Sequence, residues 1–483
     1  MMRRLGIIAL AVLAMIVAAG AFAYQYFEVG SQIAVFTGGT AKMMCSNVFV
    51  GGRTPEHVRA EDFTRRTAPG TYIGIGTTDV DMADKTVTGA LYGLVPRTAI
   101  WREGIGCTVA DGKTVEELRA QGSGVPSALP PPDETAQWPE GEATLTDNLP
   151  ADIDAAALNE AMDFAFAEPN PDEPRRTRGA LVVYRGRIVA ERYAPGFDKS
   201  MAHLSNSVAK SFTSALVGIL VGQGKLKIED PAPIDEWHGK GDPRAAITLE
   251  HLLHMSSGLE FEENYKKIKS DTTFQFVGGD LAGFSAAKPL VAKPGERWSY
   301  STGTSNILGR IVTQAAGATL ADSFAFPRRA LFDKLGMRNT VIEPDAMGNF
   351  VGGSYVFASV RDYARFGLLY LRDGVWNGER ILPEGWVAYT RTPTAHAPDD
   401  RAYGAQFWLN TGLNPNVHRY PALPPDTYAM NGHQGQHVFI VPSRDTVVVR
   451  VGLSEFPSWK MDDFVERVLK ALPNETTTEQ TAH

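Results

Sequence analysis

A regular apolar pattern marks residues 206–224, NSVAKSFTSALVGILVGQG, as a helix. The apolar positions that recur at the spacing of one helix face are Val208, Phe212, Ala215 and Ile219. The pattern lasts about four turns and then reaches glycines, which are common at helix ends. We therefore expect an amphipathic or largely buried helix that begins near Ser207 and ends by Gly222 or Gly224.

Other periodic segments supply the framework around this helix. Residues 150–168 have a helical pattern, whereas residues 179–186 and 187–195 have the pattern of two strands joined by a tight turn at Gly186. Nearer the start of the chain, short strand-like runs such as residues 85–95 alternate with turns. No internal repeat is evident in the sequence.

A proline-rich, acidic stretch, residues 124–142, interrupts these patterns and predicts a linker or an extended wrap. We place a boundary near residue 145. The expected parts of the chain are an export or anchor segment (1–24), a small N-terminal domain or wrap (25–123), a linker (124–145), a main domain (146–472) and a polar tail (473–483).

The first 24 residues are typical of an export signal. Two arginines precede an uncharged stretch, residues 5–24, that ends with the small-residue sequence AFA. This stretch is also about long enough to span a bilayer, so a cleaved signal and a retained membrane anchor both remain open. Either reading predicts a protein that is periplasmic, soluble or attached to the inner membrane.

Composition narrows the function classes. The chain has 483 residues, 43% hydrophobic and 21% charged, which indicates a folded globular protein rather than a disordered one. Its net charge of −8, without a long basic run, gives no electrostatic footprint for nucleic acid. A small-molecule or peptide-like partner is therefore expected.

The chain has two cysteines, Cys45 and Cys107, both in the part that would be exported. An oxidising compartment favours their pairing as a disulfide; two buried free thiols are the alternative. A metal site has little support, because neither cysteine has a CxxC neighbour and the spacing of His251 and His254 is not that of a zinc helix.

Ser207 and Lys210 form the sequence Ser-x-x-Lys at the start of the predicted helix. Residues three apart share a helix face, so the hydroxyl and the amine can meet, and a nucleophile with its own base is one interpretation. A serine that only caps the helix is the other. The same spacing recurs at Ser285 and Lys288, but Pro289 follows at once and disfavours a helix there.

Several ordered segments resemble the serine β-lactamase and penicillin-binding-protein superfamily, in particular its class C-like serine hydrolases. The segments are SNSVAKSFTSALVGILVGQGKLKIEDPAPID (205–235), ITLEHLLHMSSGLEF (247–261), PGERWSYSTGTSNILGRIV (294–312), residues 335–387 and NGHQGQHVFIVPSRDTVVVRVG (431–452). Together they place the resemblance over roughly residues 150–470. The closest pattern is that of 6-aminohexanoate-dimer (nylon oligomer) hydrolases and related esterases.

The resemblance implies an α/β (α+β) fold: an antiparallel sheet flanked by helices, a mainly helical subdomain and a small additional N-terminal region. It implies Ser207 as the nucleophile, Lys210 as its base and Tyr300 as the group that completes the proton relay. The oxyanion hole would be formed by the backbone N–H groups of Ser207 and Gln436. No cofactor or metal is implied.

The chain also departs from the family pattern. Thr302 stands where the Tyr-x-Asn motif has its amide, and His433-Gln434-Gly435 stands where Lys-Thr-Gly is usual. Those residues typically hold a β-lactam or a peptide carboxylate, so the departures favour linear amides or esters. His433 and Gly435 are the expected substrate-binding residues of this motif, and Tyr265 resembles the loop tyrosine that contacts the scissile amide in nylon oligomer hydrolases.

We therefore expect an exported serine hydrolase that cleaves an amide or ester through a Ser207 acyl-enzyme and resembles 6-aminohexanoate-dimer hydrolase. A carboxylesterase, or a D-amino-acid peptidase or β-lactamase of the same fold, is the alternative within the family. A periplasmic binding protein without turnover is the alternative from another class. The catalytic residues Ser207, Lys210 and Tyr300 argue against it, because a binding protein needs no such set.

Overall fold

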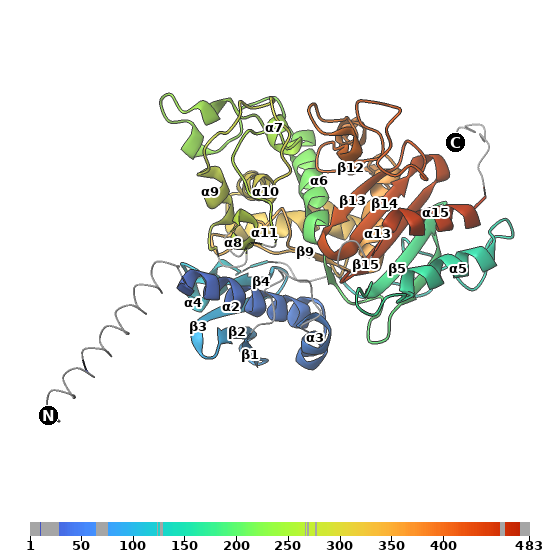
Figure 1. The fold of residues 1–483 in the computed structure, drawn as a ribbon, viewed down its shortest axis with the longest axis horizontal. Coiled ribbons are helices and arrows are strands. Elements are labelled where there is room, and N and C mark those ends of the chain that lie inside the picture. Colours follow the sequence, from blue (N-terminus) through green and yellow to red (C-terminus); the bar gives the residue numbers. More distant parts are fainter. Residues whose placement is uncertain are drawn as a thin grey trace.

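The computed structural model describes residues 10, 29–63, 76–122, 124–125, 129–265, 267, 270–275, 278–454 and 459–473. Two lobes are visible in Figure 1: a smaller one, in blue, and a larger one that contains the remaining colours. The expected export segment, 1–24, and almost all of the tail lie outside the described residues. By length and composition, one described helical segment, Val29–Val50, could cross a membrane, and 78% of its most apolar window is buried within the protein.

The smaller lobe is a helix packed on a four-stranded antiparallel sheet. The helix α2 (Val29–Cys45) continues into a π-helical turn, Ser46–Val50, and the sheet order is β1-β2-β3-β4. The strands are β1 (Thr77–Asp81), β2 (Thr86–Leu91), β3 (Leu94–Arg102) and β4 (Gly106–Val109), and the two further helices are α3 (Pro55–Asp62) and α4 (Val115–Gln121). The predicted run 85–95 is therefore one strand, its turn and the start of the next strand.

Cys45 and Cys107 form a disulfide, as predicted, with their Cα atoms 6.1 Å apart. Both are fully buried, so the bond joins α2 to β4 inside the core of the smaller lobe. The bridge closes a sequence separation of 62 residues. In the chain-entropy model, closing a loop of that length stabilises the folded lobe by about 4 kcal/mol.

The larger lobe is built on a six-stranded antiparallel sheet with the order β12-β13-β14-β15-β5-β6. Its strands are β5 (Thr177–Tyr184), β6 (Arg187–Tyr193), β12 (Trp408–Leu409), β13 (Tyr428–Gly432), β14 (Gln436–Val441) and β15 (Thr446–Gly452). Helices α5 (Ala155–Phe166) and α15 (Met461–Ala471) cover one face, and α6 (Ala209–Gly222) and α13 (Val360–Leu371) lie behind the other (Figure 1).

Burial of both faces explains why β5 is apolar from Gly179 onward. Leu181 and Val183 point into the core shared with α6 and α13, whereas Ala180 and Val182 point into the core shared with α5 and α15. Successive strand residues face opposite sides of the sheet. When both sides are covered by helices, both sets of residues are buried, so apolar and polar residues do not alternate along the strand. The predicted antiparallel sheet flanked by helices is confirmed.

One helix start and one turn differ from the sequence prediction. The helix predicted over 150–168 begins only at Ala155, because the Asp154 side chain accepts a hydrogen bond from the Ala157 N–H and caps it there. The β5–β6 turn contains Arg185 as well as Gly186, both with positive φ, which is the two-residue turn that suits the twist of a hairpin.

A mainly helical subdomain completes the larger lobe, and α6 runs between it and the sheet (Figure 1). Its helices are α7 (Leu249–Leu253), α8 (Asp271–Phe274), α9 (Leu281–Ala286), α10 (Thr302–Ala316), α11 (Leu320–Pro327) and α12 (Asp333–Leu335), with a π-helical turn, Arg328–Phe332, between the last two. The small elements β10 (Val375–Trp376), β11 (Glu379–Arg380) and α14 (Trp386–Thr390) follow α13. A short three-stranded sheet, in the order β7-β9-β8, joins β7 (His203–Leu204) to β9 (Val356–Ala358) and β8 (Val341–Ile342).

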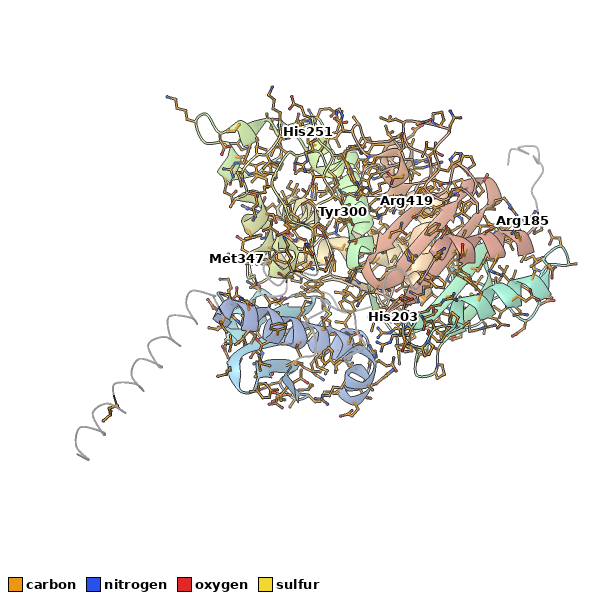
Figure 2. The ribbon with its side chains drawn as sticks, in the orientation of Figure 1. Arg185, His203, His251, Tyr300, Met347 and Arg419 are labelled. Carbon is orange, nitrogen blue, oxygen red and sulfur yellow. A yellow bond between two sulfur atoms is a disulfide. The ribbon has the colours of Figure 1, made fainter. Side chains whose placement is uncertain are left out.

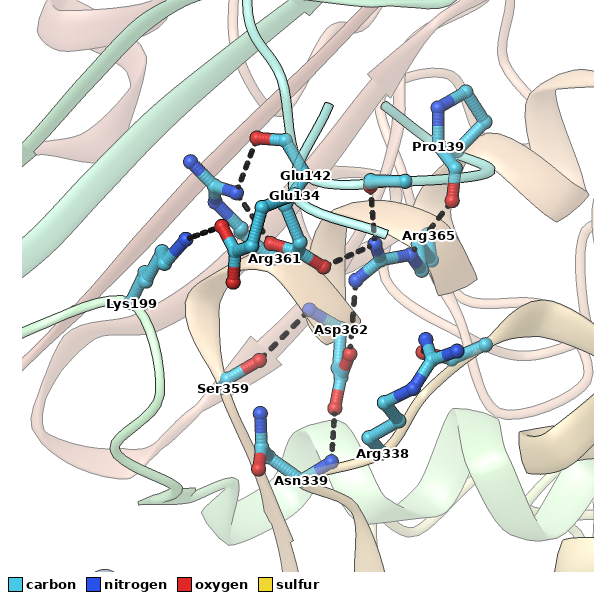
Figure 3. A network of polar contacts seen from close by, with 12 residues as sticks. Glu134, Pro139, Glu142, Lys199, Arg338, Asn339, Ser359, Arg361, Asp362 and Arg365 are labelled. Carbon is cyan, nitrogen blue, oxygen red and sulfur yellow. Dashed lines mark hydrogen bonds and ion pairs between the residues drawn. The ribbon is translucent and has the colours of Figure 1, made fainter. Parts of the chain in front are cut away.

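The described part of the proline-rich segment 124–145 is packed against the larger lobe. Trp138 is 1% exposed, within the main core. The Glu142 carboxylate pairs with two arginines of α13, Arg361 and Arg365, and its Oε1 lies 2.8 Å from the Arg365 Nη2 (Figure 3). The described part of the segment is therefore an extended wrap held by buried ion pairs.

Buried polar groups join the two lobes. Glu343, fully buried at the end of β8, pairs with Lys42 of α2 and accepts a hydrogen bond of 2.6 Å from the Cys107 N–H. Ser46 donates to the same carboxylate at 3.0 Å. Removing one partner of such a group leaves an uncompensated buried charge, so these contacts fix the smaller lobe against the larger one.

Candidate active site

The turn before α6 places Ser207 at the edge between the sheet and the helical subdomain. Asn206 has φ of 46°, in the left-handed region that Asn tolerates better than most residues, and its Nδ2 donates to the His433 carbonyl at 2.9 Å. A Cβ on Gly432 would lie 2.3 Å from the Ser205 carbonyl oxygen, so only glycine fits there. The turn into the helix is therefore clamped against the β13–β14 turn, and the predicted helix itself is confirmed.

Lys210, the second residue of α6, is 1% exposed, and its ammonium is surrounded by acceptors. Its Nζ lies 3.1 Å from the Ser207 Oγ, 3.0 Å from the Thr302 Oγ1 and 2.8 Å from the Gly353 carbonyl oxygen. Burial lowers the pKa of Lys210 to about 8, against a smaller opposing effect of the Glu263 charge. At pH 7 about a tenth of the molecules therefore carry a neutral amine.

The hydrogen bonds around Lys210 determine where the lone pair of that neutral amine points. The Gly353 carbonyl can only accept, and the Thr302 hydroxyl donates its own proton to the Glu263 Oε1 at 2.8 Å. Each of these two groups therefore accepts a hydrogen bond from one N–H of the amine. The lone pair is left for the third neighbour, the Ser207 hydroxyl, which is the arrangement that a base needs to remove its proton.

Glu263 is a site residue that the sequence analysis missed. Its carboxylate accepts from both the N–H and the hydroxyl of Thr302, each at 2.8 Å, and so fixes the N-terminus of α10 beside Lys210. The signal available was weak: Glu263 stands two residues before Tyr265 in a loop, next to a second glutamate. Thr302 thus contacts Lys210 from the position where the family pattern has Asn.

Tyr300 lies over the same amine, which is 5.0 Å from the centre of its ring. Its own ring stacks on Trp408, with centroids 5.1 Å apart, and meets Tyr403 edge to face. Burial raises the pKa of Tyr300 well above its usual value, although an interaction with Ser207 opposes that rise. The phenol therefore stays protonated at neutral pH, and of the two groups beside Ser207 it is the donor, not the base.

The loop residue Tyr265 lies in the same network. Its ring stacks on His433, with centroids 4.5 Å apart and planes within 2° of parallel. Burial is the main cause that raises the pKa of Tyr265, and Gln275, Thr302 and Glu263 interact with the same phenol. Burial also lowers the pKa of His433 to about 4, so the ring beneath Tyr265 is a neutral imidazole at pH 7.

The remaining predicted residues lie around the β13–β14 turn. Gln436 begins β14, and its side-chain amide is fixed by the Gly452 backbone, with Nε2 donating to the carbonyl at 2.6 Å. Gly435 has φ of 82°, and a Cβ there would lie 2.2 Å from the Arg450 Nη1. The Gln436 side chain is fixed and there is no room for a Cβ at Gly435, so the first peptide of β14 is held beside the Ser207 turn.

The structure thus brings both Ser207 and Tyr300 to Lys210, and stacks Tyr265 on His433. The second Ser-x-x-Lys match does not form such a pair. Ser285 donates to the Leu281 carbonyl within α9, and Lys288 pairs with Asp271 at 2.6 Å.

Comparison with known proteins gives a family and several relatives. The family model described as "Beta-lactamase" matches residues 163–465. The 6-aminohexanoate-dimer hydrolase of Paenarthrobacter ureafaciens is 26% identical over 321 residues, which cover 61% of this chain and 77% of that protein.

Two solved structures show the same fold as the larger lobe. A Bacillus anthracis protein with a provisional 6-aminohexanoate-dimer hydrolase name has a TM-score of 0.52 and 22% identity, over 72% of this chain and 88% of its own. EstCE1, a hydrolase with promiscuous acyltransferase activity, has a TM-score of 0.51 and 17% identity, over 66% of this chain and 98% of its own.

Proposed function

Because the chain belongs to the beta-lactamase family, whose members are serine hydrolases that act on amide or ester bonds, we propose that it cleaves a linear amide or a carboxylic ester through an acyl-enzyme on Ser207. The observation that carries this proposal is the position of Lys210. Its buried amine has a pKa near 8, and its lone pair meets the Ser207 hydroxyl. Such an amine can remove the hydroxyl proton and so activates Ser207 as a nucleophile.

Acylation follows from these contacts. Lys210 takes the Ser207 proton as Oγ attacks the carbonyl carbon, and the oxyanion that forms is held by the N–H groups of Ser207 and Gln436. Tyr300 donates its proton to the leaving nitrogen or oxygen and regains one from Lys210. The leaving group departs with that proton, and the acyl group remains on Ser207.

Deacylation reverses the roles. A water molecule takes the place of the leaving group, Lys210 removes its proton, and the hydroxide attacks the acyl carbon. Ser207 leaves as an alkoxide and recovers the proton. The carboxylic acid product is released, and the site returns to its starting protonation state without a cofactor.

Within this reaction, we favour a linear amide like that of the 6-aminohexanoate dimer. The relative from Paenarthrobacter ureafaciens carries that activity in its name, and the interaction of the Tyr265 phenol with Thr302 and Glu263 supports a role for it at the scissile amide. An amide nitrogen leaves poorly unless it is protonated and turned correctly. A phenol at that position assists an amide and does little for an ester.

Replacing Tyr265 with Phe is expected to lower kcat/KM for a linear amide. The loss should correspond to about 1–3 kcal/mol of transition-state stabilisation, the usual effect of an unmade polar contact. The kcat/KM for a p-nitrophenyl ester of the same acyl group should barely change. The measurement is the ratio of the two rate constants in each protein. Equal losses on both substrates would reduce Tyr265 to a loop-shaping residue, and no loss on either would make a plain esterase the better description.

Glu263→Gln is expected to move the acidic limb of the kcat/KM profile to lower pH. The Glu263 charge raises the pKa of Lys210, so removing the charge lowers that pKa and increases the neutral fraction at pH 7. The limb should shift by an amount on the order of one pH unit. Glu262→Gln is the matched control, because Glu262 pairs with Lys267 outside the network. A shift to higher pH, or the same shift in both variants, would contradict this role.

We also propose that the protein acts after export, through residues 1–24. The disulfide supports this location, because such bonds persist in oxidising compartments and are rare in the cytosol. Cell fractionation with a non-reducing thiol assay tests it: the exported fraction should contain no titratable thiol. Activity confined to the cytosolic fraction, with two free thiols, would overturn the proposal.

A further inference from the structure

The uncharged stretch, residues 5–24, ends shortly before α2 begins at Val29. Leu10, the one residue of the stretch that the structure describes, is helical and 71% exposed, so the two lobes do not bury it. If the stretch stays in a bilayer, the short connection to α2 spans at most about 18 Å. A retained anchor therefore holds the smaller lobe close to the membrane, with the start of α2 nearest to it.

The β2–β3 hairpin turn lies at the same end of the smaller lobe as the start of α2. The Thr37 Oγ1 donates to the Val95 carbonyl at 2.8 Å. Further along α2, Cys45 is bonded to Cys107, which pairs with Trp101 across the sheet. The helix α2 and the strand β3 therefore run in the same direction. Measured back from this hydrogen bond, α2 begins about 12 Å away and the hairpin turn lies about 10 Å away, so both reach the same edge.

The hairpin turn exposes two large apolar side chains. Tyr92 and Gly93 form the turn, both with positive φ, and Leu94 follows it. Tyr92 is 93% exposed and Leu94 is 56% exposed. Asparagine, aspartate and glycine are the residues that such a turn favours, so a tyrosine here strains the backbone while its ring remains in solvent. Tyrosine is enriched where proteins meet lipid headgroups, which is a contact that this ring can make.

A third exposed apolar residue, Met347, lies towards the same edge of the molecule. It is 48% exposed, and Figure 2 labels it beside the end of the blue lobe where α2 begins in Figure 1. Its N–H donates to the Gly279 carbonyl at 3.1 Å, and a Cβ on Gly279 would lie 2.2 Å from the Asp111 carbonyl oxygen. Asp111 pairs with Arg97 of β3 at 2.8 Å. Met347 therefore lies near the part of the sheet that leads to the hairpin turn, and the acidic group there is neutralised.

We propose that residues 5–24 remain as a membrane anchor and that the smaller lobe rests on the lipid bilayer through Tyr92, Leu94 and Met347. The bilayer is the partner to which the short connection before α2 points, and an aromatic ring beside apolar side chains suits its headgroup region. The smaller lobe then acts as a spacer that holds the larger lobe, with Ser207, at a fixed height above the membrane. The inference rests on the proposed export and is independent of the chemistry at the serine.

Photocrosslinking tests the contact in the full-length protein, reconstituted in vesicles of phosphatidylethanolamine and phosphatidylglycerol. Tyr92→p-benzoylphenylalanine places the probe in the hairpin turn. The matched control places it at Met82, which is 52% exposed in the β1–β2 turn at the other end of β2. Mass spectrometry should find about tenfold more lipid adducts at position 92 than at position 82, because only a group at the lipid boundary reaches the acyl chains. Equal yields, no lipid adducts at position 92 in the folded variant, or crosslinks from it to a second copy of the chain would overturn the proposal.

A second probe and a mass measurement complete the test. Met347→p-benzoylphenylalanine should also form lipid adducts, and it replaces the first probe, with the same outcomes, if the Tyr92 variant does not fold. The intact mass of the exported wild-type protein should include residues 1–24, and loss of this segment would overturn the proposal. Ester hydrolysis by a protein that forms no lipid adducts defeats the membrane contact alone, whereas lipid adducts without any hydrolysis support the contact and defeat the proposed function.

Discussion

Lys210→Ala is expected to lower kcat/KM by roughly three orders of magnitude or more on every substrate, with the fold intact. The lysine is the group whose lone pair meets the Ser207 hydroxyl, because its two N–H bonds are committed to Thr302 and Gly353. Without it, the serine hydroxyl has no base and is a weak nucleophile. Steady-state kinetics, with circular dichroism to confirm folding, measures this.

The pH profile of the wild-type protein provides an independent reading of the same role. Only the neutral amine is a base, so kcat/KM should rise with pH and level off above the pKa of Lys210, which burial lowers to about 8. Lys288→Ala is the matched control, since this lysine belongs to the second Ser-x-x-Lys match but pairs with Asp271. Near-normal turnover by Lys210→Ala, or a similar loss in Lys288→Ala, would refute the assignment.

Tyr300→Phe is expected to slow catalysis by roughly 10²–10⁴-fold, equivalent to about 3–5 kcal/mol in the barrier. The raised pKa keeps the phenol protonated, and its interaction with Ser207 places the phenol beside the reacting atoms. The substitution retains the ring, its stacking on Trp408 and its contact with the lysine, and removes only the hydroxyl. The loss should be greater for amides than for p-nitrophenyl esters, whose leaving group needs no proton.

A buried tyrosine beside it supplies the comparison. Tyr403 packs edge to face against Tyr300, with centroids 5.7 Å apart, and is itself 1% exposed. Tyr403→Phe removes a hydroxyl from the same aromatic cluster but not from the proton relay, and should leave rates within a few-fold of wild type. If the rates of Tyr300→Phe also stayed within a few-fold of wild type, Tyr300 would be a packing residue and the relay would need another proton donor.

The sequence was sufficient for those parts of the site that depend on local spacing. The apolar repeat predicts α6, and the three-residue interval in a helix predicts that Ser207 and Lys210 meet. The strand pattern predicts β5 and β6, although the turn between them needed a second residue with positive φ. The single possible pairing of two cysteines predicts the disulfide.

Contacts between distant segments were outside the reach of such patterns. Glu263 fixes Thr302 across 39 residues, and Lys42 meets Glu343 across 301, with no periodicity that links either pair. The same limit explains the wrap: a proline-rich composition predicts an extended chain, but the partners of Glu142 on α13 depend on how the lobe packs.

The central claim is that Ser207 forms a covalent acyl-enzyme, and labelling with a fluorescent alkyl phosphonate followed by mass spectrometry of the labelled peptide tests it most directly. We expect one equivalent of label on wild-type protein, located at Ser207. Ser207→Ala should take up none, and Ser285→Ala, the serine of the second Ser-x-x-Lys match, should be labelled as wild type. Wild-type protein that takes up no label, or Ser207→Ala that is labelled equally, would contradict the account.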